Sequence, residues 1–88
     1  MNSRKVILAY LANRRTGAFA EMAIVQVANR TGLLAKPLSE AECFEDLRWM
    51  ANSMRWVDMI TDPESGAALW SVMDEGMRRW NLDGRLAV

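Results

Sequence analysis

The sequence predicts one small domain of the α+β class, spanning residues 1–88 and mostly helical, with three helices, a two-stranded hairpin and a short closing helix in that order. Three observations predict this class. Apolar residues recur at helical spacing in the first three segments, the spacing changes to a period of two after Arg55, and turn-forming residues separate two short apolar runs. With 51% hydrophobic and 25% charged residues, the chain has the composition of a globular domain with a single core.

The first helix is predicted over residues 3–14. Ser3 is expected to cap it, and Gly17 follows as a stop. Residues at three-and-four spacing mark its buried face. They are Ile7, Tyr10 and Leu11, with Leu8 as a further candidate.

The second helix is predicted to begin near Phe19 and to end at Gly32. Ile24, Val25 and Val27 make this segment apolar over much of its circumference. A helix with that pattern is buried on several sides, so this helix is expected to be the most buried of the chain.

The third helix is predicted to begin after Ser39, because Ser39 and Glu42 have the spacing of a capping box. Acidic residues fill its first turns, where they also complement the helix dipole. Cys43 is expected to be a small buried hydrophobe, and a single cysteine permits no intramolecular disulfide, which suits a reducing compartment. The predicted apolar stripe consists of Cys43, Phe44, Leu47, Met50, Ala51 and Met54.

Residues 56–60 and 67–73 alternate as strands do, and residues 62–66 between them carry turn-forming side chains in suitable order. The sequence therefore predicts a hairpin. Trp56 and Trp70 are expected to lie on its two strands.

The closing helix is predicted over residues 77–82, with Trp80 in the core and Gly84 as part of its stop. Flexible methionine side chains suit adaptable surfaces as well as irregular cores. A homodimer contact through the terminal helices, with Met22, Met73 and Met77 as candidates, is therefore left open.

Eleven basic and eleven acidic residues cancel, and the pI of about 6.2 lies well below the value of roughly 9 that marks a strongly basic nucleic-acid-binding domain. Overall charge therefore gives no argument for DNA binding. Any such function has to come from a local arrangement of cations.

An enzyme is not expected. The chain has no histidine, and its paired acids, such as Glu45 with Asp46, are adjacent in sequence and do not predict carboxylates facing across a cleft. No glycine-rich phosphate loop precedes a helix, and no cofactor or metal site is expected. The basic and apolar N-terminal run lacks a small-residue cleavage site, which favours a cytoplasmic location without a signal peptide or membrane span.

The order of three helices, the third capped and followed by a hairpin, is that of a winged helix-turn-helix domain. The chain also resembles a family of small proteins of Mu-like phages and prophages that are similar to ArsR-type winged-helix proteins. The resemblance implies DNA binding, transcription regulation and residence in the bacterial host cytoplasm. The residues that carry it are Arg4-Lys5-Val6-Ile7-Leu8-Ala9-Tyr10-Leu11, the segment 20–32, Asp46-Leu47-Arg48-Trp49-Met50-Ala51, and Met73-Asp74-Glu75-Gly76 with Gly84 downstream.

The chain departs from this family pattern at two points. Such families place a glycine between the third helix and the hairpin, and this chain is expected to use Asn52 in the left-handed conformation there. ArsR-type sensors bind metals through paired cysteines and histidines, and a chain with one cysteine and no histidine is not expected to sense metals.

Two functional hypotheses follow. In the first, the protein binds double-stranded DNA through Arg48, Asn52 and Arg55, and a dimer adds Arg14 and Arg15 by bringing this pair and the Arg78-Arg79 pair onto one face.

In the second, the same scaffold serves as an adaptor, inhibitor or DNA mimic that contacts a basic protein and does not bind DNA. Its contact surface would be the acidic face of the third helix and the hairpin tip, because opposite charges favour such an encounter. The candidate residues are Glu42, Glu45, Asp46, Asp62 and Glu64.

Overall fold

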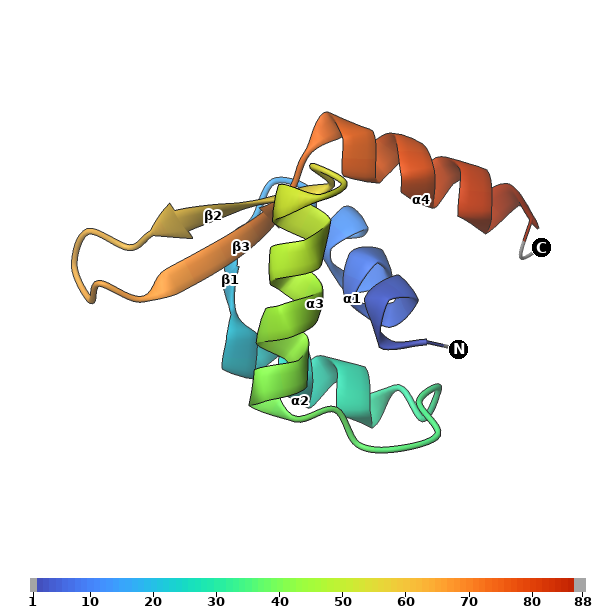
Figure 1. The fold of residues 1–88 in the computed structure, drawn as a ribbon, viewed down its shortest axis with the longest axis horizontal. Coiled ribbons are helices and arrows are strands. Elements are labelled where there is room, and N and C mark those ends of the chain that lie inside the picture. Colours follow the sequence, from blue (N-terminus) through green and yellow to red (C-terminus); the bar gives the residue numbers. More distant parts are fainter. Residues whose placement is uncertain (1, 87–88) are drawn as a thin grey trace.

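The computed structural model of the protein describes residues 2–86 and confirms the α+β class, with four helices and a small antiparallel sheet among those residues. Figure 1 shows α3 in front of α1 and α2, the hairpin extending to one side and α4 extending to the other. The elements are α1 (Ser3–Ala12), β1 (Phe19–Ala20), α2 (Glu21–Arg30), α3 (Glu40–Asn52), β2 (Val57–Thr61), β3 (Ala68–Val72) and α4 (Asp74–Leu86).

Helix α1 is capped by Asn2, whose side-chain oxygen accepts from the Lys5 backbone N–H at 2.8 Å. The expected cap, Ser3, is the first helical residue instead, and the helix ends at Ala12, two residues earlier than predicted. The predicted apolar face is confirmed. The buried residues of α1 are Val6, Ile7, Leu8, Tyr10, Leu11 and Ala12.

The expectation that the second helix is the most buried is wrong, because α1 holds the central place. Helix α1 contacts α2, α3, α4 and β3. Helix α2 buries Ile24, Val25 and Ala28, and leaves Val27 at the edge of the core. The apolar residues around α2 therefore did not identify the most buried helix, because burial depends on how many other elements surround a helix.

Strand β1 was not predicted. Phe19 pairs with Trp70 and Ala20 pairs with Leu69 in antiparallel register, so the sheet has the order β1-β3-β2. Two residues are too few to display a period of two, and the sequence therefore assigned Phe19 to the helix. The Phe19 ring instead packs edge-on against Tyr10, with ring centres 5.2 Å apart.

The capping box of α3 is confirmed. The Ser39 hydroxyl accepts from the Glu42 backbone N–H at 3.1 Å, and the Glu42 carboxylate accepts from the Ser39 backbone N–H at 3.4 Å. Cys43, Leu47 and Met50 are buried as predicted.

Two members of the predicted α3 stripe are exposed instead. Met54 is 39% exposed because the helix ends at Asn52, so the helical periodicity does not extend to it. Phe44 is 37% exposed and lies at the edge of the stripe.

The chain reverses at Arg55, and the expected left-handed residue, Asn52, is still helical. Arg55 has φ of +56°, and the Trp56 backbone N–H then donates to the Met50 carbonyl at 2.9 Å. Since α3 continues to residue 52, the turn that a glycine would occupy falls three residues later than expected.

The predicted hairpin is confirmed. Strands β2 and β3 pair antiparallel from Val57↔Val72 to Thr61↔Ala68, with the turn between them. Gly66 closes this turn with φ of +74°, a conformation that glycine adopts without a steric penalty. Trp70 lies on β3 and is buried, whereas Trp56 precedes β2.

Helix α4 is longer than the predicted residues 77–82, since it begins at Asp74 directly after β3 and passes Gly84 without ending. Gly76 lies where this helix meets the start of β2. A Cβ atom there would stand 2.2 Å from the Trp56 carbonyl oxygen, so only glycine fits. Trp80 is half-buried and packs against the core.

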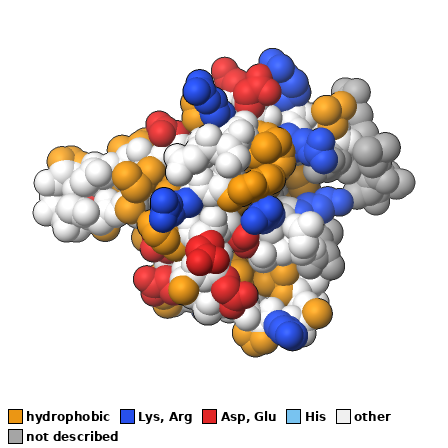
Figure 2. Space-filling model, viewed as in Figure 1, with side chains coloured by type: hydrophobic (Ala, Val, Ile, Leu, Met, Phe, Trp, Pro, Cys, Tyr) orange, Lys and Arg blue, Asp and Glu red, His pale blue; other side chains and the backbone are white. Residues whose placement is uncertain are grey.

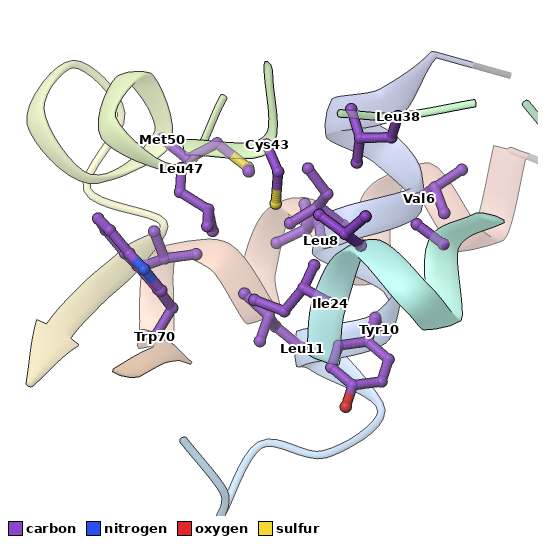
Figure 3. Close-up of a cluster of buried hydrophobic side chains, with 14 residues drawn as sticks. Val6, Leu8, Tyr10, Leu11, Ile24, Leu38, Cys43, Leu47, Met50 and Trp70 are labelled. Atoms are coloured by element: carbon purple, nitrogen blue, oxygen red, sulfur yellow. The ribbon is translucent and has the colours of Figure 1, made fainter. Parts of the chain in front are cut away.

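The core lies between α1, α2, α3 and the sheet (Figure 3). Side chains from α3 and β3 meet those of α1 there, with Leu47 and Met50 close to Trp70 in the view. Within residues 2–86, no helix is long and apolar enough to cross a membrane.

Candidate functional site

A groove of about 540 Å³ runs between the second half of α3 and the hairpin. It brings together three candidates that the sequence pointed to, Arg48, Asn52 and Arg55. The full lining is Phe44, Arg48, Ala51, Asn52, Arg55, Val57, Asp58, Met59, Trp70 and Met73.

The helix and the turn after it place these three side chains. Arg48 and Asn52 are four residues apart on α3, so they lie one above the other on the same face. The left-handed turn at Arg55 brings the third side chain back to the same groove. All three residues are exposed, and polar side chains from two successive turns therefore line the same groove.

The groove has an apolar base and rim. Trp70 is buried at its base, where the indole Nε1–H donates to a Glu21 carboxylate oxygen at 3.2 Å. Phe44, Met59 and Met73 are each 37–47% exposed around it. The site can thus combine hydrogen bonds from cations with contact to an apolar or flat surface.

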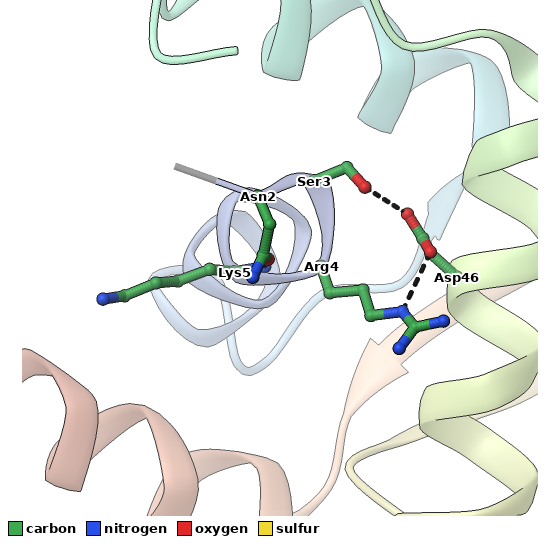
Figure 4. A network of polar contacts seen from close by, with 5 residues as sticks. All are labelled: Asn2, Ser3, Arg4, Lys5 and Asp46. Carbon is green, nitrogen blue, oxygen red and sulfur yellow. Dashed lines mark hydrogen bonds and ion pairs between the residues drawn. The ribbon is translucent and has the colours of Figure 1, made fainter. Parts of the chain in front are cut away.

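The acid closest to the centre of α3 is already paired within the protein. The Ser3 hydroxyl and the Arg4 Nε–H both donate to the Asp46 carboxylate, the latter at 3.0 Å (Figure 4). The Asp46 side chain is 14% exposed. Asp46 therefore joins α3 to α1 and contributes little to the outer surface of α3.

The remaining charges are divided along α3. Glu42 is exposed and belongs to the capping box, and Glu45 is exposed one turn before Arg48. Figure 2 shows acidic side chains gathered over the first half of α3, whereas the one cation of this helix, Arg48, lies in its second half. The net charge of zero thus conceals an uneven local distribution of charge.

The hairpin tip has no cation, because no lysine or arginine occurs from residue 56 to residue 77. Asp62 is engaged in the turn itself, accepting from the Glu64 backbone N–H at 3.1 Å and from the Ser65 hydroxyl at 2.8 Å. The Ser65 hydroxyl, followed by the Glu64 N–H, lowers the pKa of Asp62. Glu64 is exposed.

Arg14 and Arg15 lie in the turn after α1 and do not line the groove. The Arg14 guanidinium stacks over the Tyr10 ring, 4.3 Å from its centre. The structure therefore places this pair apart from Arg48, Asn52 and Arg55.

A second hollow, of about 350 Å³, was missed by sequence reasoning. It lies between α1, α3 and α4 and collects three cations from two helices that are far apart in the sequence. No spacing in the chain indicates this arrangement. The lining residues are Asn2, Arg4, Lys5, Leu8, Trp49, Trp56 and Arg79.

Comparisons with protein-family models, curated proteins and solved structures give no significant match to this chain. The function of the protein is therefore inferred mainly from the residues and geometry of the two hollows.

Proposed function

We propose that the protein is a winged-helix protein of phage or prophage type that binds double-stranded DNA and regulates transcription. The observation that carries the proposal is the convergence of Arg48, Asn52 and Arg55 in one exposed groove beside the hairpin. In this proposal α3 enters the major groove and the β2–β3 hairpin is the wing.

The order of elements supports the winged-helix assignment. A short strand after α1, two further helices and a hairpin whose second strand pairs with that short strand give the order β1-β3-β2. The resemblance to small Mu-like phage proteins supports the regulatory role and the bacterial cytoplasm as the location.

The chemistry of the three side chains suits base reading. An arginine can donate two hydrogen bonds to guanine O6 and N7, and an asparagine can pair with adenine N6 and N7. Arg48 and Asn52, one helical turn apart, can reach successive base pairs. Arg55, in the left-handed turn three residues after α3, would contact a phosphate.

Acidic residues oppose this function less than their number implies. Asp46 is held by Arg4 and Ser3, and Glu42 caps its own helix. Glu45 is the exposed acid closest to Arg48 in sequence on the outer face of α3. Repulsion of phosphate therefore comes from the first half of the helix and from Asp58, an exposed acid that lines the groove itself.

The test is fluorescence anisotropy with a random-sequence duplex across a salt series. We expect affinity to fall linearly with salt on logarithmic axes. Arg48→Ala and Arg55→Ala are each expected to weaken binding by about 1–3 kcal/mol. Arg30→Ala, at an exposed arginine near the end of α2, is the matched control and should bind like wild type.

Absence of duplex binding even at low salt would overturn the proposal. Wild-type affinity in both Arg48→Ala and Arg55→Ala would remove α3 from the DNA contact.

A second candidate function, contact with a basic protein partner, is favoured by the acidic first half of α3 and by the absence of cations from the hairpin. Glu42, Glu45 and Glu64 are exposed on these parts. Glu45→Lys is the informative variant, because Glu42 and Asp46 also stabilise the fold. Loss of partner capture from host lysate in this variant, but not in Glu75→Lys, which makes the same change of two charge units on α4, would support the candidate. Unchanged capture would oppose it.

A further inference from the structure

We propose that the hollow between α1, α3 and α4 is a phosphate-binding site. It would take consecutive phosphate groups, either of a nucleic-acid backbone or of a free oligophosphate. The proposal is independent of base reading by the groove. Only the choice of duplex DNA as the source of the phosphates rests on the function proposed above.

The charges that line the hollow favour an anion. Arg4, Lys5 and Arg79 all line the hollow, and no acidic side chain is among the lining residues that the structure describes. The first turn of α1 has no acidic residue of its own, and the Asp46 carboxylate of α3 contacts Ser3 and Arg4 there. A cavity lined by three cations attracts anions.

Both arginines lie near a tryptophan. The Arg4 guanidinium lies 4.0 Å from the centre of the Trp49 ring, and that of Arg79 lies 5.8 Å from the centre of Trp56, at the outer limit of a cation–π contact. The two indoles pack edge to face at 5.5 Å. Because Arg4 is held by Trp49 and Asp46, it loses less conformational entropy on binding.

Arg4 can serve the fold and a ligand together. Its Nε–H donates to Asp46, and this is the Arg4 contact that Figure 4 marks to that carboxylate. A guanidinium has five N–H donors, so the Asp46 contact leaves donors suited to a phosphate fork.

The spacing of the cations favours a run of phosphates over a single ion. Figure 4 shows the Arg4 and Lys5 side chains leaving α1 in opposite directions, so one compact anion does not meet both. The volume of about 350 Å³ lies in the range of small-molecule sites. Linked phosphates fit this arrangement better than one inorganic phosphate.

A continuous surface joins the hollow to the DNA groove. A shallow depression on α3 is lined by Arg48 and Asn52, which also line the groove, by Trp49, which also lines the hollow, and by Glu45 and Ser53. Blue side chains cross this face in Figure 2. A DNA strand that leaves the groove over α3 therefore reaches the hollow, which makes its backbone the favoured source of phosphate.

The first arm of the test measures duplex binding across a salt series for Lys5→Gln and Arg79→Gln. Each is expected to weaken binding equally for all sequences and to lower the salt slope by about 1. Lys36→Gln, in the loop between α2 and α3, and Arg78→Gln, which pairs with Glu75 outside the hollow, are matched controls with an unchanged slope. Arg4 is left intact because it also holds Asp46.

The second arm titrates wild type with pyrophosphate at constant ionic strength and follows the indole N–H signals by NMR. The signals of Trp49 and Trp56 are expected to shift, whereas that of Trp70, bound to Glu21, stays in place. Lys5→Gln should reduce the shifts, and Lys36→Gln should not.

The outcomes separate the two proposals. Pyrophosphate shifts without duplex binding by wild type would assign the hollow to a free oligophosphate and overturn the DNA function. Duplex binding with unchanged salt slopes in Lys5→Gln and Arg79→Gln, together with unmoved Trp49 and Trp56 signals, would overturn the proposal that the hollow binds phosphate. It would not affect the proposal that the groove contacts DNA. Absence of both duplex binding and pyrophosphate shifts would overturn both.

Discussion

Cys43 illustrates how burial sets chemistry at the scale of one residue. Its side chain is fully buried under α3, and burial, with smaller contributions from Glu21, Asp46 and Glu40, raises the pKa of the thiol from 9.0 to about 12. A thiol reacts as the thiolate, so the folded protein should be nearly inert to thiol reagents at mildly alkaline pH.

The prediction is slow labelling of Cys43 by a disulfide reagent at pH 8 and fast labelling once urea unfolds the chain. The same shift has a consequence for stability. The unfolded thiol ionises from about pH 9, while the folded thiol stays protonated up to about pH 12, so the free energy of unfolding falls as pH rises through this window. A Cys43→Ala variant should lack this part of the alkaline decline, and an identical decline in both proteins would contradict the assignment.

Among the described glycines, Gly76 is the one at which an added Cβ atom would meet the closest neighbour. A methyl group there would meet the Trp56 carbonyl at 2.2 Å and Val72 at 2.8 Å, whereas one at Gly66 would meet no atom within 4 Å. Gly76→Ala is therefore expected to lower the free energy of unfolding by about 1–3 kcal/mol through overpacking. Urea denaturation checks this value.

Gly66→Ala serves as the comparison. Its cost comes only from the positive φ of +74° and is expected at about 1 kcal/mol. An equal or smaller loss in Gly76→Ala than in Gly66→Ala would contradict the close contact between α4 and the start of β2.

At the scale of elements, the contact between α1 and α3 depends on Asp46. Its carboxylate accepts from Arg4 and Ser3 across more than forty residues of sequence, with its side chain mostly buried and that of Arg4 44% exposed. Because Arg4 is partly solvated, the pair should contribute modestly.

A double-mutant cycle with Asp46→Asn and Arg4→Gln is expected to give a coupling energy of about 0.5–1 kcal/mol in urea denaturation. A matched cycle on Glu75 and Arg78, an exposed pair on α4, should give a smaller value. A coupling energy near zero for Asp46 and Arg4 would show that the contact does not hold the two helices together.

Elements with strong local signals were predicted from the sequence, and those defined by distant contacts were not. The capping box at Ser39 and the turn at residues 62–66 are local chemistry, and both are present. Strand β1 exists because Phe19 and Ala20 meet β3, fifty residues away, and two residues carry no period. Helix α4 passes Gly84 because one glycine lowers helix propensity without ending a helix.

The same division applies to the sites. Arg48, Asn52 and Arg55 were proposed together from the sequence, and the structure places all three in the lining of one groove. The hollow that holds Arg4, Lys5 and Arg79 depends on the packing of α1 against α4, which no local pattern contains.

At the scale of the whole molecule, the exposed apolar residues near α4 lead to a prediction about assembly. Leu82, within α4, is 52% exposed and lies outside the groove that Met73 borders. We propose that this face of α4 forms a homodimer, a possibility that the sequence left open. Two copies would present two grooves to a DNA site with matching half-sites.

Sedimentation velocity over a wide range of protein concentration measures this association. Wild type is expected to shift from monomer to dimer as concentration rises, and Leu82→Asp should remain monomeric at every concentration. Leu33→Asp, at a comparably exposed leucine in the loop after α2, is the control and should still dimerise. A wild-type protein that stays monomeric throughout would contradict the homodimer.

Trp56 contacts three separate parts of the molecule. Its backbone N–H bonds to α3, its carbonyl accepts from Met73 at 2.8 Å and touches Gly76, and its indole lines the phosphate hollow. One residue thus connects α3, the hairpin and α4 by close packing. The fold therefore sets the distance between the two hollows, and a DNA that bound both of them as proposed would have to match that distance with its backbone.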